Sequence, residues 1–179
     1  ERRRLPRRHR PGVTEVVAGP VRDGTGGGAS TPRPRVRFKR LPSNPDLPLP
    51  SRATPQAAGF DVRTCQDEVV LAPGEIRLVD TGLVMELPEG IECQVRPRSG
   101  LALKHGVTLP NSPGTIDPDY RGELRVIMQN LGNEPVRLAR GERIAQLVFA
   151  RFEAPDIEEA DTLSQTARGP GGFGSTGTD

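Results

Sequence analysis

The chain has 179 residues and a formal net charge of +2, a length typical of one domain with short appendages. It contains no Trp, one Tyr and five Phe, so an aliphatic core is expected. No apolar run reaches the length of a membrane-spanning helix, which excludes that class of membrane protein and predicts a soluble chain, with the cytoplasm as its default location.

Positive charge is concentrated near the N-terminus. Residues 1–40 contain twelve Lys and Arg against three acidic residues, a net charge of +9, whereas residues 41–179 carry −7. Residues 1–35 also combine prolines with a glycine tract and few apolar side chains, so they bury too little surface to offset the entropy of ordering. We predict a disordered basic extension here, with a transit peptide as the alternative. Nucleic acid is not expected to bind the acidic part of the chain, residues 41–179. Weak contact between nucleic acid and the basic extension is left open.

Short strands joined by turns are predicted over residues 36–152. Gly and Pro number 21 and 19, which is typical of short strands rather than helices. Five prolines between residues 42 and 55 predict an extended, non-helical crossing segment. Apolar or alternating runs between turn signals predict these strands: Val36–Leu41, Gly59–Thr64, Val69–Leu71, Gly74–Leu78, Leu83–Leu87, Ile91–Arg96, Arg121–Asn130, Val136–Leu138 and Ile144–Phe152.

One short helix is predicted over Ser99–Lys104, with Ser99 as its N-cap. The predicted elements indicate an all-β sandwich, barrel or jelly roll. Cys65 and Cys93 lack the C-x-x-C spacing and the neighbouring His of a zinc site. The simpler interpretation is two buried free thiols, and a single disulfide between them is left open.

The C-terminal arm, residues 153–179, ends in a segment rich in glycine. Residues Arg168–Gly177 set one cation, one aromatic ring and two hydroxyl groups among five glycines. Glycine lets backbone N–H groups approach an anion, Arg suits phosphate, and Phe offers a face for a base. The segment therefore fits a mobile lid over a nucleotide, and a disordered glycine-rich tail is the alternative.

Five segments stand out in chain order: Ala58–Val62, Pro97–Ala102, Gly114–Glu123, Gly141–Leu147 and Arg168–Gly177. They resemble, in order, the five motifs of the trimeric dUTPase family, and the resemblance covers roughly residues 36–179. It implies a jelly-roll-like β subunit with one short helix over residues 36–152, assembled into a homotrimer whose active sites are shared between subunits. It also implies a dUTP diphosphatase, which hydrolyses dUTP to dUMP and pyrophosphate, limits uracil in DNA and supplies dUMP for dTTP synthesis.

The resemblance assigns phosphate contacts to three of these segments. Arg98, Ser99 and Gly100 offer a guanidinium, a hydroxyl and backbone N–H groups, a combination suited to phosphate. An ordinary capping Ser beside a surface Arg is the alternative. Arg143 is left open between a local role in the site and a salt bridge at the surface or at an interface. The other residues assigned to the phosphates are Gln146, Arg168, Ser175 and Thr176.

Catalysis and base recognition are assigned by the same resemblance. Asp117 corresponds to the carboxylate that orients and deprotonates the attacking water, with a role in shaping a hairpin turn as the alternative. Tyr120, the single Tyr, corresponds to the ring that packs under the deoxyribose and excludes a 2′-hydroxyl. Asn111 and Thr115 belong to the hairpin region that contacts uracil and sugar, and Phe173 corresponds to the ring that stacks on uracil.

Asp61 corresponds to a supporting carboxylate near the metal-bound waters, and a turn-capping Asp is the alternative interpretation. Mg²⁺ is expected as cofactor, held by the triphosphate and water without a direct protein ligand. Two other functions are left open by the sequence. One is an enzyme related to dCTP deaminase, and the other is a dUTP-binding regulator of the same fold that lacks catalysis.

Overall fold

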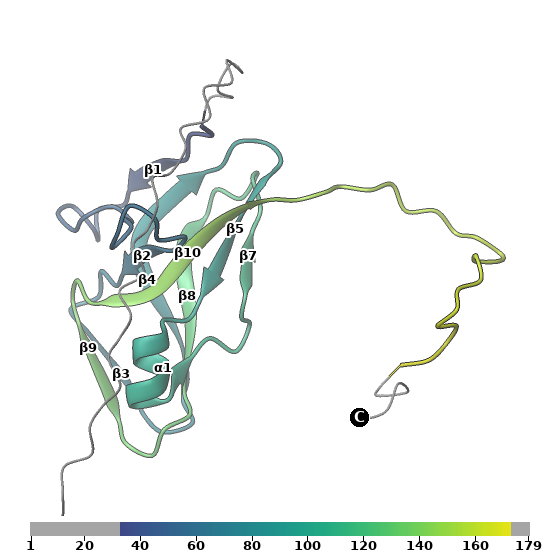
Figure 1. The fold of residues 1–179 in the computed structure, drawn as a ribbon. Helices are drawn as coiled ribbons and strands as arrows, with labels where there is room; N and C mark the ends of the chain where they lie inside the picture. The colour runs from purple at the N-terminus through teal and green to yellow at the C-terminus, as the bar shows by residue number, and fades with distance from the viewer. Residues whose placement is uncertain (1–32, 173–179) are drawn as a thin grey trace, which may run out of the picture. The chain divides into compact units, whose positions relative to one another are not determined.

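A computed structural model describes residues 33–172, which form an antiparallel β fold with one short helix (Figure 1). The expected all-β class is confirmed. Within this range no helix has the length and apolarity needed to cross a membrane. The elements are β1 (Arg37–Arg40), β2 (Phe60–Arg63), β3 (Glu68–Leu71), β4 (Ile76–Glu86), β5 (Ile91–Arg96), α1 (Ser99–His105), β6 (Val107–Thr108), β7 (Gly114–Ile116), β8 (Glu123–Asn130), β9 (Val136–Ala139) and β10 (Arg143–Arg151).

The strands form two four-stranded sheets and one pair. The four-stranded sheets have the orders β1-β4-β8-β6 and β2-β10-β5-β7, and β3 pairs with β9. Every pairing is antiparallel. Because strands far apart in sequence, such as β2 and β10, lie side by side, the chain passes repeatedly from one sheet to the other, as in a jelly roll.

Alternation along the strands separates an apolar core from polar outer faces. In β8, the buried residues Leu124, Val126 and Met128 alternate with residues that are more exposed, which is the two-residue period of a half-buried strand. Cys93 on β5 is fully buried, and this burial raises the pKa of its thiol to about 12. Cys65 is also buried, and both thiols are free, in agreement with the sequence-based interpretation.

The sequence prediction is wrong at β4, where one strand replaces the two predicted as Gly74–Leu78 and Leu83–Leu87. The polar residues between them lie in an irregularity of the strand rather than in a turn. Its register against β8 shifts between Asp80 and Val84, and the Thr81 hydroxyl donates to the Leu124 carbonyl at 2.5 Å. Gly82 there has a φ of +64°, a backbone conformation that favours glycine.

The helix also differs from its prediction at the N-terminus. Ser99 is its first residue, while Arg98 occupies the N-cap position in an extended conformation without a side-chain cap. Ser99 is therefore not the cap. The helix ends at Gly106, whose φ of +68° is the left-handed conformation common after a helix. Two strands of two and three residues, β6 and β7, were not predicted at all.

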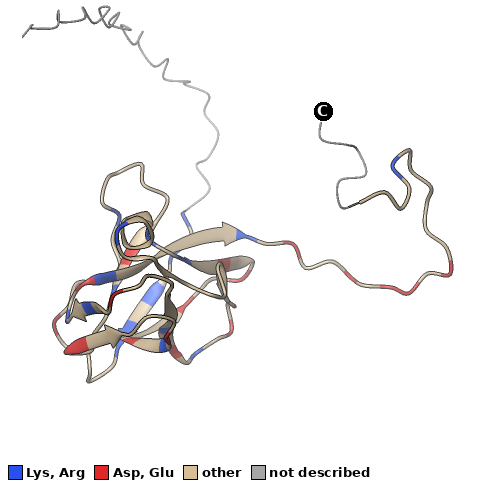
Figure 2. Cartoon of the chain, turned by 90° about the horizontal axis from the view of Figure 1, so that it is seen from below, with Lys and Arg blue, Asp and Glu red and all other residues tan. Residues whose placement is uncertain are grey.

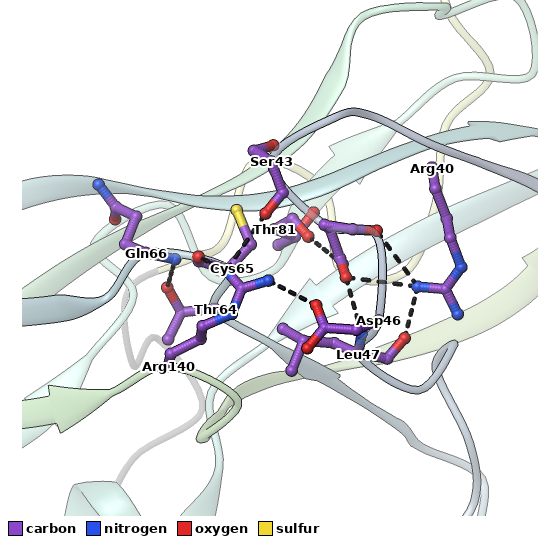
Figure 3. A network of polar contacts seen from close by, with 10 residues as sticks. Arg40, Ser43, Asp46, Leu47, Thr64, Cys65, Gln66, Thr81 and Arg140 are labelled. Carbon is purple, nitrogen blue, oxygen red and sulfur yellow. Dashed lines mark hydrogen bonds and ion pairs between the residues drawn. The ribbon is translucent and has the colours of Figure 1, made fainter.

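Residues 42–58 contain no helix, as expected, but they fold into turns rather than extending throughout. Asn44 is 1% exposed and donates from Nδ2 to the Thr81 carbonyl at 2.7 Å. Arg140 binds the Asp46 carboxylate at 2.7 Å and also donates to the Cys65 carbonyl. These contacts, drawn in Figure 3, fasten the segment that leads into β2.

Candidate active site

Asp61 on β2 is the centre of a cluster of charged side chains. Its side chain is only 18% exposed, and each of its two oxygens binds an arginine. Oδ1 accepts from Arg98 Nε at 3.1 Å, and Oδ2 accepts from Arg143 Nη1 at 2.8 Å. Arg98 Nη1 also donates to the Arg143 carbonyl at 3.0 Å. We call Asp61, Arg98 and Arg143 the arginine clamp, and it joins β2, β10 and the residue preceding α1.

Gln146 lies next to the arginine clamp because of the strand register. On β10 it faces Asp61 of β2 on one side and Arg96 of β5 on the other. Residues paired across neighbouring strands point to the same face of a sheet. The Gln146 side chain donates from Nε2 to the Pro97 carbonyl at 2.9 Å. The structure therefore brings together the phosphate-binding residues predicted on β10 and on the segment before α1.

Ser99 and Gly100 follow Arg98 directly and are exposed at the start of α1. The first N–H groups of a helix have no partner within the helix. A hollow of about 510 Å³ next to Arg98 and Arg143 is also lined by Arg63, Arg137 and Arg140, with His105 and Glu142 at its walls. This excess of guanidinium groups makes the hollow suited to a polyanion. Of the residues predicted to contact phosphate, Arg98 lines it, whereas Ser99, Gly100 and Gln146 do not.

The remaining predicted residues of the core line a second, separate hollow of about 230 Å³. Asn111, Thr115, Asp117 and Tyr120 all line it, and its apolar wall includes Leu78, Ile116, Leu124 and Ile127. A carboxylate, an amide and an aromatic ring beside apolar side chains form the mixture of groups found in small-molecule sites. The predicted catalytic and base-recognition residues of the hairpin are thus close together.

The turn that carries Asp117 and Tyr120 is held by its own hydrogen bonds. The Tyr120 N–H donates to the Asp117 carbonyl at 3.2 Å, and Arg121 Nη1 donates to the Pro118 carbonyl at 2.6 Å. The Tyr120 hydroxyl donates to the Glu123 carbonyl at 3.1 Å. The main-chain carbonyl of Asp117 therefore closes a turn, and its side chain presents an exposed carboxylate beside the hollow.

The two hollows have no lining residue in common. The arm supplies a third group of residues, of which Arg168 is exposed and binds the Gly171 carbonyl at 2.9 Å. Phe173, Ser175 and Thr176 lie outside the described residues. The described part of the arm is rich in acidic residues before Arg168 (Figure 2).

Arg143 is the residue whose role the sequence left open. Its guanidinium and its carbonyl both belong to the arginine clamp. The one sequence signal was its position three residues before Gln146 on an otherwise apolar strand. Over residues 33–172 no group of three or more His, Cys, Asp or Glu side chains could hold a metal ion.

Comparison with known proteins places these residues in one family. A family model described as dUTPase matches residues 46–177. A deoxyuridine 5′-triphosphate nucleotidohydrolase of Thermoanaerobacter sp. (strain X514) is 52% identical over 143 residues, covering 79% of this chain and 97% of that protein. One of Mesorhizobium japonicum is 53% identical over 148 residues, covering 81% and 92%. A solved structure of the Staphylococcus bacteriophage 80alpha dUTPase with dUPNHPP superposes with a TM-score of 0.73 at 27% identity, covering 80% of this chain and 99% of that one.

Proposed function

The chain belongs to the dUTPase family, and on this premise we propose that it is a dUTP diphosphatase, which hydrolyses dUTP to dUMP and pyrophosphate. The observation that carries the proposal is the hollow where Asn111, Thr115, Asp117 and Tyr120 meet. It combines a carboxylate for the chemistry with groups that can select a base and a sugar. Relatives named for this activity match the chain along nearly their whole length.

Asp117 is the residue that we assign to the chemical step. Its exposed carboxylate orients a water molecule and takes its proton. The water oxygen bonds to the α-phosphorus, the bond from this phosphorus to the α–β bridging oxygen breaks, and pyrophosphate leaves with that electron pair. Phosphoryl chemistry of this kind depends mainly on positioning and on charge stabilisation, so a weak base in a fixed place is sufficient.

The arginine clamp supplies that stabilisation on the phosphate side. Because Asp61 holds Arg98 through Nε, and the Arg143 carbonyl holds its Nη1, the Arg98 guanidinium is oriented before a substrate binds. A charge held in place in advance costs no reorganisation during the reaction. We assign phosphate contacts to Arg98, Ser99, Gly100 and Gln146. A lid over phosphates and uracil is assigned to Arg168, Phe173, Ser175 and Thr176.

Mg²⁺ fits this site as an ion carried by the substrate. Each oxygen of Asp61 already accepts from an arginine, so we assign this carboxylate to the waters around the ion, which its remaining lone pairs can accept from, and not to the ion itself. Mg²⁺ in phosphate sites commonly keeps several waters and binds mostly to the substrate. When bound, the ion would neutralise charge on the triphosphate oxygens.

Under this proposal the complete site is shared between copies of the chain, with the phosphate-binding residues, the hairpin of Asp117 and the C-terminal arm coming from three different subunits. No residue lines both the hollow with Asp117 and the hollow with Arg98 within one subunit, and this separation supports a site to which more than one copy contributes. A homotrimer with shared sites, as the sequence resemblance implies, provides such a site. The roles in limiting uracil in DNA and in supplying dUMP, and the cytoplasmic location, stay predictions.

The test is product analysis with the full chain and Mg²⁺. We expect dUTP to give equal amounts of dUMP and pyrophosphate, with far slower turnover of UTP and dCTP. Release of ammonia from dCTP would instead establish a deaminase, and tight dUTP binding without turnover would establish a regulator. Sedimentation at several concentrations gives the oligomeric state, and an active monomer would contradict the shared site.

A further inference from the structure

Three glycines lie directly against side chains that we assign to the substrate. A Cβ added at Gly59 would lie 2.1 Å from Gln146 Oε1, and one added at Gly114 would lie 3.0 Å from Asn111 Nδ2. At Gly122 it would lie 2.3 Å from the Tyr120 hydroxyl oxygen. None of the three has a left-handed φ, so what distinguishes these positions is the space that a Cβ would occupy rather than conformational freedom.

The contact at Gly122 is the tightest against a ring. A Cβ there would also lie 2.5 Å from Cζ and 2.9 Å from Cε2 of Tyr120, all well inside the 3.5–4.0 Å separation of carbon atoms in normal contact. The ring therefore lies across the backbone of residue 122, and its hydroxyl reaches the Glu123 carbonyl at 3.1 Å. The turn Asp117–Arg121 is braced separately by its own hydrogen bonds.

We infer that Gly122 is a positioning residue that sets the place of the Tyr120 ring and, through it, the discrimination between deoxyribose and ribose. Any larger residue at position 122 displaces the ring from the backbone and breaks its bond to Glu123. Since Tyr120 lines the same hollow as Asp117, a displaced ring changes the space left for the sugar. This inference rests on the proposed function for its substrate, but not for the position of the ring.

The chain offers a direct readout of this ring. It contains one Tyr and no Trp, so the intrinsic fluorescence of the native protein reports Tyr120 alone. In Gly122→Ala we expect both the emission intensity and its quenching by acrylamide to change. Unchanged emission and quenching would overturn the inference, whatever the protein hydrolyses.

The functional readout is the ratio of kcat/KM for dUTP to that for UTP. We expect Gly122→Ala to lower this ratio by about tenfold, the effect of changing a pocket by one methyl-sized group. A ratio equal to that of the wild type would overturn the inference. If the wild-type protein does not hydrolyse dUTP, the proposed function fails, and the fluorescence result still decides the position of the ring.

A double-mutant cycle separates the ring from other effects of the added methyl group. In a Tyr120→Ala background no ring meets the new Cβ, so adding Gly122→Ala should change neither kcat/KM nor melting temperature further. If Gly122→Ala alone fails to fold, the cycle still tests the inference, because the double variant lacks the ring and should fold. A double variant that is worse than Tyr120→Ala would place the cause in the backbone and overturn the inference. Gly74→Ala, in an open turn with φ +78°, is the control for destabilisation alone and should leave the ratio unchanged.

Discussion

Asp61→Asn is the sharpest test of the arginine clamp, because it keeps the shape of the side chain and removes its charge. The amide oxygen can still accept from one guanidinium, while the amide NH₂ group faces the other donor. The bond to Arg98 is the one that counts most, since the Asp61 and Arg98 side chains are 18% and 24% exposed. The Arg143 side chain is 42% exposed, so solvent screening reduces the stabilisation that its ion pair with Asp61 contributes.

Two magnitudes follow from this geometry. Losing a hydrogen bond to a charged group costs about 1.5–3 kcal/mol of unfolding free energy, which corresponds to roughly 3–12 °C in melting temperature for a domain of this size. An Arg98 guanidinium that is no longer held on two sides loses its alignment with the phosphates. Misplacement on this scale lowers kcat/KM for dUTP by about 10- to 100-fold.

The assay pairs thermal unfolding with dUTP hydrolysis for Asp61→Asn and for a matched control. Glu86→Gln removes the carboxylate from another Arg pair, Arg37–Glu86 at 3.2 Å, whose side chains are 76% and 49% exposed and line neither hollow. We expect this control to change unfolding free energy by at most about 1 kcal/mol and kcat/KM not at all. If Asp61→Asn loses stability while kcat/KM stays that of the wild type, the clamp only joins strands, and our argument about Arg98 is refuted.

Four further predictions follow from the site and the fold. Asp117→Asn should abolish dUTP turnover while calorimetry still detects nucleotide binding, and appreciable turnover would remove Asp117 from the role of base. Truncation after Gln165 should cripple turnover with little change in melting temperature, because the described arm is exposed; a large loss of stability would make the arm structural. Deletion of residues 1–35 should leave dUTP hydrolysis within about twofold of the full chain, as expected for a change outside the site, and a larger loss would tie this segment to the site. Burial raises the pKa of Cys93 from 9.0 to about 12, so between these values the unfolded chain loses a proton that the native chain keeps. Urea unfolding should therefore show stability falling as pH rises, with Cys93 contributing up to about 1.4 kcal/mol per pH unit. Cys93→Ala should remove this contribution and leave the part that comes from Cys65, whose pKa burial also raises; an unchanged slope would contradict the prediction.

Sequence alone predicted those parts of the molecule whose signal is local. The strand Ile91–Arg96 was predicted with its observed bounds because its buried residues alternate strictly. The residues around Asp117 were assigned through the family resemblance, and Asn111, Thr115 and Tyr120 meet in one hollow because they lie within one hairpin region of ten residues. Strands of two or three residues, such as Gly114–Ile116, show no period and were missed.

The rest depended on contacts between distant segments. Gly82 interrupts the apolar pattern of β4 and reads as a turn, yet the strand continues because Glu123 and Thr81 bond across the irregularity. The arginine clamp joins residues 61, 98 and 143. Nothing in the local pattern at Arg143 states which carboxylate it meets, so its role could only be left open.

The glycines show most clearly what a sequence cannot distinguish. Gly74 and Gly122 are both glycines beside turn residues, and the sequence does not distinguish them. Gly74 has a φ of +78° with open space where a Cβ would lie, whereas Gly122 lacks a left-handed φ and has the Tyr120 ring against it. At Gly74 an alanine meets a backbone penalty, so stability falls and the site is untouched. At Gly122 an alanine meets the Tyr120 side chain, so the ring moves and substrate selection falls. Since the two causes predict opposite outcomes for stability and selectivity, the pair of substitutions decides between conformation and space as the reason for each glycine.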